Sequence, residues 1–327
     1  MELFKNYYKM EEAMLTNYCS SRSDVANLIT EYLPYYVNLT GHLSFVLAVY
    51  IGTAIYMSDL MKMSGYKSVM YYVFTIGARR TVPFFMRNVW LLMKEEIQEY
   101  IYKATNYTTT KANFVESVLS VMEGESLALM CVERFSNAHQ EARNGRVNEM
   151  LNKLLVHLSI MYGLFYSAPM LWGFSANLQQ YDYMTCDLDL YLGDSYDKHL
   201  TGVLFVMKVI KPQMVCISYL SRTLAIEAKT PNTRRSNTRE LTQAVLRVVI
   251  VHIISVFPTL NYYAFNILSQ ILGYDANPPR NSYIVIVSSV LYSADGILGM
   301  LILLVMDKTL YKSTLEMRQR LAAYFRF

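Results

Sequence analysis

The chain has 327 residues, 53% of them hydrophobic, and a formal net charge of +4 at pH 7. This hydrophobic fraction is too high for an ordinary soluble domain, and the apolar residues are gathered into long runs with few charges. The composition therefore excludes an ordinary soluble domain and favours a membrane protein.

The N-terminal segment, residues 1–32, precedes the first long apolar run. Residues 1–24 contain no apolar core of the length that a cleaved signal peptide requires. We therefore expect the first membrane span to direct insertion, with residues 1–32 forming an extracellular segment.

Apolar runs of membrane-spanning length follow along the chain. A bilayer core about 30 Å thick requires roughly 20 apolar helical residues, and five runs reach this length without difficulty. Two more runs, at 69–93 and 113–135, are long enough but contain charges. The alternative for these two is a buried or amphipathic helix of a soluble domain.

The sequence therefore predicts an all-α membrane protein with seven transmembrane helices within residues 33–306. A cytoplasmic tail, residues 307–327, is expected to contain a short amphipathic helix. The predicted spans are about 33–58, 68–93, 112–135, 154–176, 200–224, 245–272 and 282–306.

Charged residues inside the second and third predicted spans have opposite signs. The second span contains Arg79, Arg80 and Arg87, and the third contains Glu116, Glu123 and Glu125. Because charges at membrane depth usually pair within the bundle, we expect ion pairs between these two helices. Glu123 and Glu125 cannot both face the same partner. The alternative is that the second span is misplaced and its arginines lie near the membrane interface.

Prolines occur in the fourth, fifth and sixth predicted spans, at Pro169, Pro212 and Pro258. A proline kinks a spanning helix and opens room between helices, where ligand pockets form. Lys208 lies in the outer half of the fifth span, and snorkelling of its long side chain is the alternative to a pocket role. The pocket candidates are Glu116, Lys208, Tyr262, Tyr263, Tyr292 and Asp295.

Orientation follows from the distribution of Lys and Arg. With the N-terminus outside, the inner segments hold roughly twice as many of these residues as the outer ones, as expected for cytoplasmic loops. Two Asn-x-Thr glycosylation acceptors, at Asn106 and Asn38, then lie on the outer side. Asn106 is the better candidate, because Asn38 lies at the edge of the first span. The opposite topology is the alternative.

The sequence contains no pattern that predicts enzymatic chemistry or a cofactor. Neither a phosphate-binding glycine loop nor a nucleophile–base cluster is present, and the four cysteines have no metal-ligand spacing. Cys19 and Cys186 both lie outside in this topology, so a disulfide between them is a candidate. The basic inner loops are short and bounded by membrane. They suit anionic membrane lipid and a cytosolic partner, and no nucleic acid.

An acid–base–aromatic triplet, Glu133-Arg134-Phe135, ends the apolar run of the third span, and "MDKTLY" follows the seventh, with Asp307 and Tyr311 four residues apart. These landmarks resemble the rhodopsin-like seven-helix receptors, in which such a triplet closes the third helix and (Asn/Asp)-Pro-x-x-Tyr closes the seventh. The resemblance implies that Arg134 is the switch residue facing a heterotrimeric G protein. It makes Glu133 the resting-state restraint and Tyr311 a late partner of Arg134.

The chain departs from the general receptor pattern, since Lys308 stands where the family has proline and no cysteine begins the third span. The triplet and the segment "NTRRSNTRELTQAVLR" before the sixth span are most similar to nematode serpentine chemosensory receptors of the alpha, alpha-beta and epsilon classes. This resemblance implies a small-molecule ligand and the plasma membrane of a sensory neuron. Whether the receptor is a homodimer stays open.

Two other functions stay open from the sequence. A transporter or channel subunit would use the intramembrane charges as a polar path, although no inverted repeat is visible. A non-signalling membrane scaffold would use the third inner loop for docking alone.

Overall fold

The computed structural model describes residues 33–63, 65–92, 108–142, 149–168, 206, 210–229, 236–271 and 282–324. Several residues selected from the sequence lie outside this part of the chain or have side chains outside it. They are Cys19, Asn38, Arg80, Arg87, Asn106, Glu116, Pro169, Cys186, Lys208, Pro258, Tyr262, Tyr263 and Tyr292.

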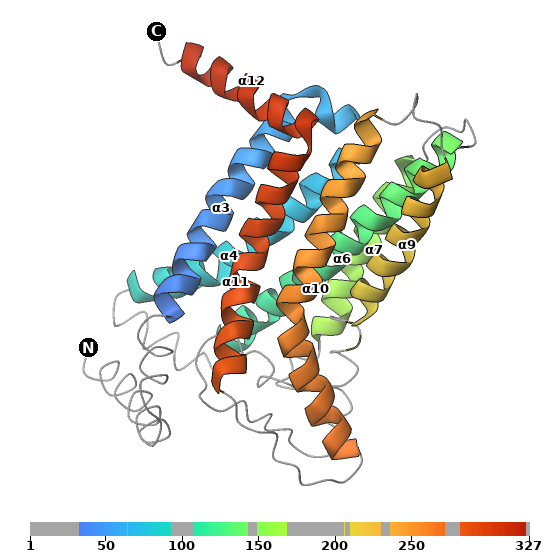
Figure 1. The fold of residues 1–327 in the computed structure, drawn as a ribbon. Coiled ribbons are helices and arrows are strands. Elements are labelled where there is room, and N and C mark those ends of the chain that lie inside the picture. The colour runs from blue at the N-terminus through green and yellow to red at the C-terminus, as the bar shows by residue number, and fades with distance from the viewer. Residues whose placement is uncertain are drawn as a thin grey trace.

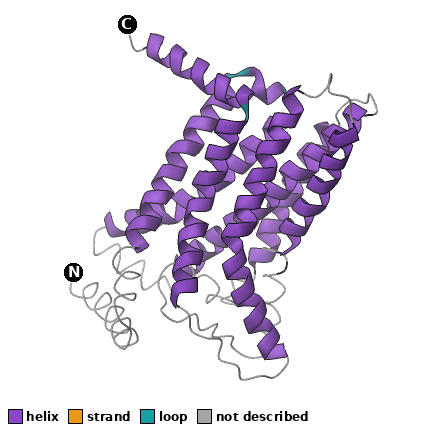
Figure 2. Ribbon diagram, viewed as in Figure 1, coloured by secondary structure: helices purple, strands orange, loops and turns teal. Residues whose placement is uncertain are grey.

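Seven long helices of the described chain lie side by side, and a further helix, α12 (Lys308–Tyr324), projects from one end of the bundle (Figure 1, Figure 2). We call this end the α12 end. A short 3-10 helix, η1 (Asp59–Lys62), lies between the first two long helices. The seven are α3 (Leu33–Met57), α4 (Tyr66–Leu92), α6 (Thr108–Ala142), α7 (Glu149–Ser167), α9 (Lys211–Lys229), α10 (Ser236–Ile271) and α11 (Ser282–Met306). The predicted all-α seven-helix architecture is confirmed.

Helices α3, α4, α6, α9, α10 and α11 pack as a closed ring, and α7 packs on α6 outside it. In chain order, α3 packs against α4, α4 against α6, and α6 against both α7 and α9. Helix α10 contacts α6 and α9 and packs closely on α11, which returns to α3 and completes the ring. Helix α12 packs on α3 and α11. Helix α6 therefore packs on four of the described helices, which places its side chains at the centre of the bundle.

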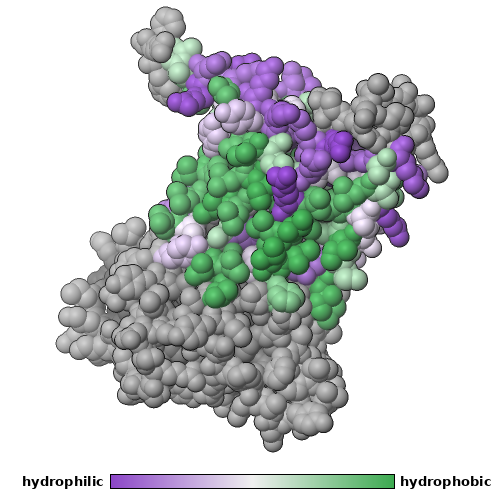
Figure 3. All heavy atoms as spheres, in the orientation of Figure 1, coloured by the Kyte–Doolittle hydropathy of each residue, from purple (hydrophilic) through white to green (hydrophobic). Residues whose placement is uncertain are grey.

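Apolar side chains cover the outside of the bundle as well as its interior, as expected for helices that face lipid. On α3, Ile51 and Ile55 are fully buried, whereas Val46 is 64% exposed. Figure 3 shows hydrophobic residues along the middle of one face and hydrophilic residues toward the α12 end. Two described stretches, Leu39–Met57 and Arg239–Phe257, are long and apolar enough on their own to cross a membrane.

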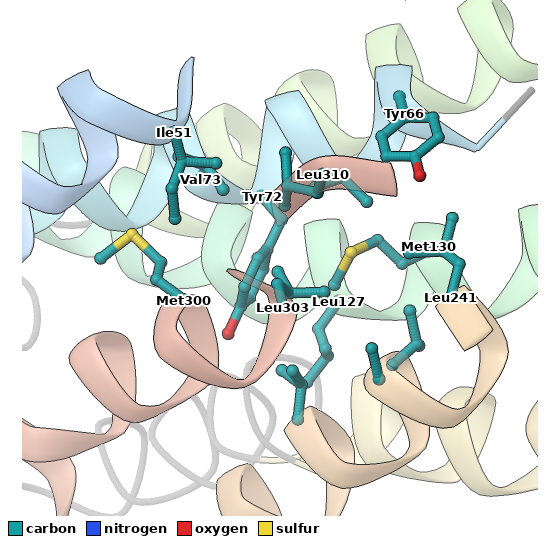
Figure 4. Packing of buried hydrophobic residues seen from close by; sticks show 14 of the residues in the cluster. Ile51, Tyr66, Tyr72, Val73, Leu127, Met130, Leu241, Met300, Leu303 and Leu310 are labelled. Carbon is teal, nitrogen blue, oxygen red and sulfur yellow. The ribbon is translucent and has the colours of Figure 1, made fainter. Parts of the chain in front are cut away.

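The buried apolar cluster draws side chains from α3, α4, α6, α9, α10, α11 and α12. Figure 4 shows Met300 and Leu303 of α11 among residues of neighbouring helices, including Tyr72 of α4. All three side chains are at most 2% exposed. Because helices distant in sequence share this cluster, packing here fixes how the α12 end is assembled.

Helix α6 is longer than the third predicted span. The span was expected to end at the triplet Glu133-Arg134-Phe135, but the helix continues to Ala142, roughly two turns further. The added segment contains helix-compatible polar residues, and the ring of Phe135 stacks on that of His139 four residues on, with centroids 5.8 Å apart. The triplet therefore lies within a continuous helix, which holds its side chains in fixed directions.

Candidate functional site

The triplet is the starting point for the site at the α12 end. Glu133 and Arg134 are only 2% and 3% exposed, although both are ionisable. Oε1 of Glu133 accepts a hydrogen bond from the backbone N–H of Gly65 at 3.0 Å. Buried charges need such partners, because an unpaired buried charge is strongly destabilising. The acid of the triplet is thus fixed to the connection between η1 and α4.

Gly65 also accommodates Arg134. The residue has φ +100°, a conformation that L side chains rarely adopt, and a Cβ placed on it would overlap Nη2 of Arg134. The guanidinium therefore lies directly over the Gly65 backbone. Sequence reasoning missed Gly65, although a glycine in a short connection between two helices is a recognisable signal for a special backbone conformation.

Tyr66 and Asp307 form the next part of the site. The Tyr66 hydroxyl donates to Oδ2 of Asp307 at 2.7 Å, and both residues are buried. Oδ1 of Asp307 accepts from the backbone N–H groups of Thr309 at 3.0 Å and Leu310 at 3.2 Å. Asp307 is therefore the N-cap of α12, a position that Asp favours because its carboxylate satisfies free N–H groups. One carboxylate joins α4 to the start of α12.

The electrostatics of this pair are dominated by burial. Tyr66 and Asp307 lie just outside the predicted spans. Burial raises the pKa of Asp307, while the hydrogen bonds from Tyr66, Leu310 and Thr309 and the positive charge of Arg134 act in the opposite direction. Burial, followed by the Asp307 charge, raises the pKa of Tyr66 and keeps its hydroxyl protonated as a donor. Arg134 is thus close enough to Asp307 to stabilise its carboxylate.

The two aromatic residues of the predicted switch lie elsewhere. Phe135 is half-buried and meets the ring of Tyr219 on α9 edge-on, with centroids 5.4 Å apart. Tyr311 lies in the first turn of α12 with its side chain 52% exposed. The structure thus brings Glu133, Arg134 and Asp307 to one buried site and leaves Tyr311 at the surface.

Buried charges in the middle of the bundle are paired across helices. Arg79 on α4 forms an ion pair with Glu123 on α6, and both side chains are at most 5% exposed. Nζ of Lys211 on α9 lies 2.8 Å from Oε1 of Glu125, and 4.0 Å above the ring of Tyr162 on α7. The predicted ion pairing between the second and third helices is confirmed. The two acids face different helices, as their spacing required.

A second buried pair joins α10 to α11. Nδ1 of His252 lies 2.7 Å from Oδ2 of Asp295, whose side chain is 1% exposed. The other carboxylate oxygen of Asp295, Oδ1, has no hydrogen-bond partner among the described residues. An unsatisfied buried acceptor is destabilising unless a donor reaches it. This oxygen is therefore a place where a bound molecule with an N–H or O–H group would gain a hydrogen bond.

Other predicted features can be located only in part. Pro212 is buried near the start of the described part of α9. Cys131 and Cys216 are buried free thiols. Among the residues that the structure describes, no group of three or more His, Cys, Asp or Glu side chains could hold a metal ion.

Comparison with solved structures identifies a similar fold. The chain is similar to the crystal structure of squid rhodopsin, with a TM-score of 0.63 at 10% sequence identity, over 89% of this chain and 85% of that one. No protein-family model and no curated protein matches the sequence. The described helices therefore have the seven-helix fold of rhodopsin.

Proposed function

We propose that the chain is a seven-helix receptor that binds a small molecule from outside and activates a heterotrimeric G protein at the α12 end. The observation that carries this proposal is the buried Glu133–Arg134 doublet, docked on Gly65 and beside Asp307, at one end of a rhodopsin-like bundle. Arg134 lies over the Gly65 backbone and near the Asp307 carboxylate, and neither interaction is covalent, so a rearrangement of the bundle would free the guanidinium for a partner.

In this mechanism the ligand shifts an equilibrium between two arrangements of the bundle by binding one of them better. In the resting arrangement Arg134 stays over Gly65. In the signalling arrangement the α12 end of α10 moves outward and the guanidinium leaves Gly65 to meet the partner. Exposed basic residues near the same end, such as Arg222 and Arg239, attract the partner's acidic surface.

Asp295 supports a ligand site near the middle of the bundle. Its Oδ1 is buried between α10 and α11 and accepts no hydrogen bond from the described residues, so a ligand donor there would supply one. The other proposed pocket residues are Glu116, Lys208, Tyr262, Tyr263 and Tyr292, with kinks at Pro169, Pro212 and Pro258. Their contribution is a proposal from the sequence alone.

The cellular setting is also part of the proposal. The excess of Lys and Arg in the predicted inner loops supports an extracellular N-terminus. The similarity to nematode serpentine receptors supports a chemosensory role in the plasma membrane of a sensory neuron. Glycosylation at Asn106 or Asn38 and a disulfide between Cys19 and Cys186 belong to the same topology. Helix α12, with exposed Lys312, Arg318 and Arg320, would contact anionic lipid.

The experiment is a ligand screen in cells with a calcium or cyclic-nucleotide readout, comparing the natural chain with Arg134→Ala. The matched control is Arg320→Ala, which removes an exposed arginine from α12. Arg134→Ala should abolish the response while surface expression stays normal, and Arg320→Ala should retain most of it. A full response from Arg134→Ala would overturn the proposed role of the triplet.

A transporter or channel subunit is the second candidate, because Arg79, Glu123, His252 and Asp295 place buried charge on four helices. These groups form pairs across helices, which favours a structural role over an open polar path. Ion or solute flux into vesicles containing the purified protein would support the transporter. Flux abolished by the double substitution Arg79→Met with Glu123→Leu, which leaves no unpaired buried charge, would establish it.

A further inference from the structure

The junction between α11 and α12 contains two adjacent residues of opposite charge, Asp307 and Lys308. Asp307 is turned into the bundle, where it caps α12 and binds Tyr66 of α4. Lys308 is turned outward, and its Nζ lies 2.7 Å from Oε1 of Glu240 on α10. The carboxylate of Glu240 raises the pKa of Lys308. Asp307 thus connects the start of α12 to α4, and Lys308 connects it to α10.

Other side chains of the described residues also hold the α12 end of α10. Thr242 donates to Oε1 of Glu227 on α9 at 2.7 Å. Nη1 of Arg247 lies 2.7 Å from the sulfur of Met306, the last residue of α11. The contact with Lys308 is a pair of opposite full charges. It also involves a junction that is fixed by the buried Asp307.

We propose that the α11–α12 junction is a latch on α10: Lys308 holds Glu240, and the buried Asp307 anchors the junction to α4. Outward movement of α10 must separate Lys308 from Glu240. The junction itself resists displacement because Asp307 would lose its hydrogen bonds to Tyr66 and to the first turn of α12. The consequence for signalling rests on the proposed function, whereas the mechanical role of the junction does not.

The strength of the latch follows from its exposure. The Lys308 and Glu240 side chains are 81% and 30% exposed, so water and salt screen their attraction. A pair of this kind shifts an equilibrium by roughly two- to fivefold. Such a latch biases the position of α10 without locking it, and a ligand with modest preference for the open arrangement can release it.

The test uses the full-length protein, purified into lipid nanodiscs, with spin labels carried by unnatural amino acids at positions 62 on η1 and 239 on α10. Pulsed electron paramagnetic resonance gives the distribution of distances between the two labels. The longer distances give the fraction of molecules in which α10 has moved outward, called here the open fraction. The variants are Lys308→Glu, Glu240→Lys and the double exchange. The control is Lys312→Glu, because Lys312 is equally exposed but faces Glu316 of its own helix at 4.0 Å.

Each single reversal should raise the open fraction roughly two- to fivefold, and the double exchange should return it to the natural value. Lys312→Glu should leave the distribution unchanged. Unchanged distances in both single variants, or a double exchange as open as the single variants, would overturn the latch. If the distances respond as expected but no variant alters G-protein activation, the latch stands and the proposed function fails.

Discussion

Gly65→Ala is the most informative single substitution at the α12 end, because two separate penalties arise from one methyl group. The first is conformational: Gly65 has φ +100°, and an alanine in a left-handed conformation lowers the free energy of unfolding by about 1–2 kcal/mol. The second is steric, since the new Cβ would occupy the space of the Arg134 guanidinium. Displacing a buried charged group from its hydrogen bonds costs about 1.5–3 kcal/mol. Together the two penalties should lower the free energy of unfolding by about 2.5–5 kcal/mol.

The two penalties can be separated by a double-mutant cycle. In an Arg134→Ala background the guanidinium is absent. Gly65→Ala should then lower the free energy of unfolding only by the conformational part, about 1–2 kcal/mol. The assay is equilibrium unfolding of the purified protein in mixed detergent micelles. Gly52→Ala is the control, because a Cβ there would meet Met70 at an ordinary 3.6 Å. Equal losses from Gly65→Ala in both backgrounds would refute the packing of Arg134 on Gly65.

Three further outcomes are expected. Arg79→Met or Glu123→Leu alone should destabilise the protein by about 3–5 kcal/mol in the same unfolding assay, and the double substitution by much less, because it leaves no unpaired buried charge. Tyr66→Phe should cost about 1.5–3 kcal/mol, the value of a hydrogen bond to a charged group. Burial raises the pKa of Asp307, so from about pH 4 up to its raised pKa the folded state binds more protons than the unfolded chain. The free energy of unfolding should therefore fall as pH rises through this window, and Asp307→Asn, which still caps α12, should remove that part of the decrease.

The sequence predicted the helices and one of the central ion pairs because both depend on local composition. Long apolar runs indicate spanning helices wherever they lie, and opposite charges on consecutive spans indicate pairing between them. Arg79 and Glu123 satisfy that expectation. The partner of Glu125 was not predicted, since Lys211 lies on a helix distant in sequence and its side chain reaches α6 only once α9 is packed there.

The contacts of the triplet could not be predicted for the same reason. Its composition indicated an arginine held by a neighbouring group. The glycine at position 65 signals a special backbone conformation, but nothing in the sequence shows that Arg134, 69 residues later, lies over it. Asp307 was selected because of a motif at the end of the seventh span. In the structure it acts as the cap of α12 and the acceptor of the Tyr66 hydroxyl. Nothing in the sequence distinguishes Tyr66 among the 28 tyrosines of the chain.

Nucleotide exchange on purified heterotrimeric G proteins tests the central claim most directly. The protein in lipid nanodiscs is mixed in turn with each G-protein class, with and without a ligand found in the cellular screen. The account predicts that the liganded protein accelerates exchange on at least one class and that Arg134→Ala does not. Equal acceleration by Arg134→Ala, or a liganded protein that leaves exchange on every class unchanged, would contradict it.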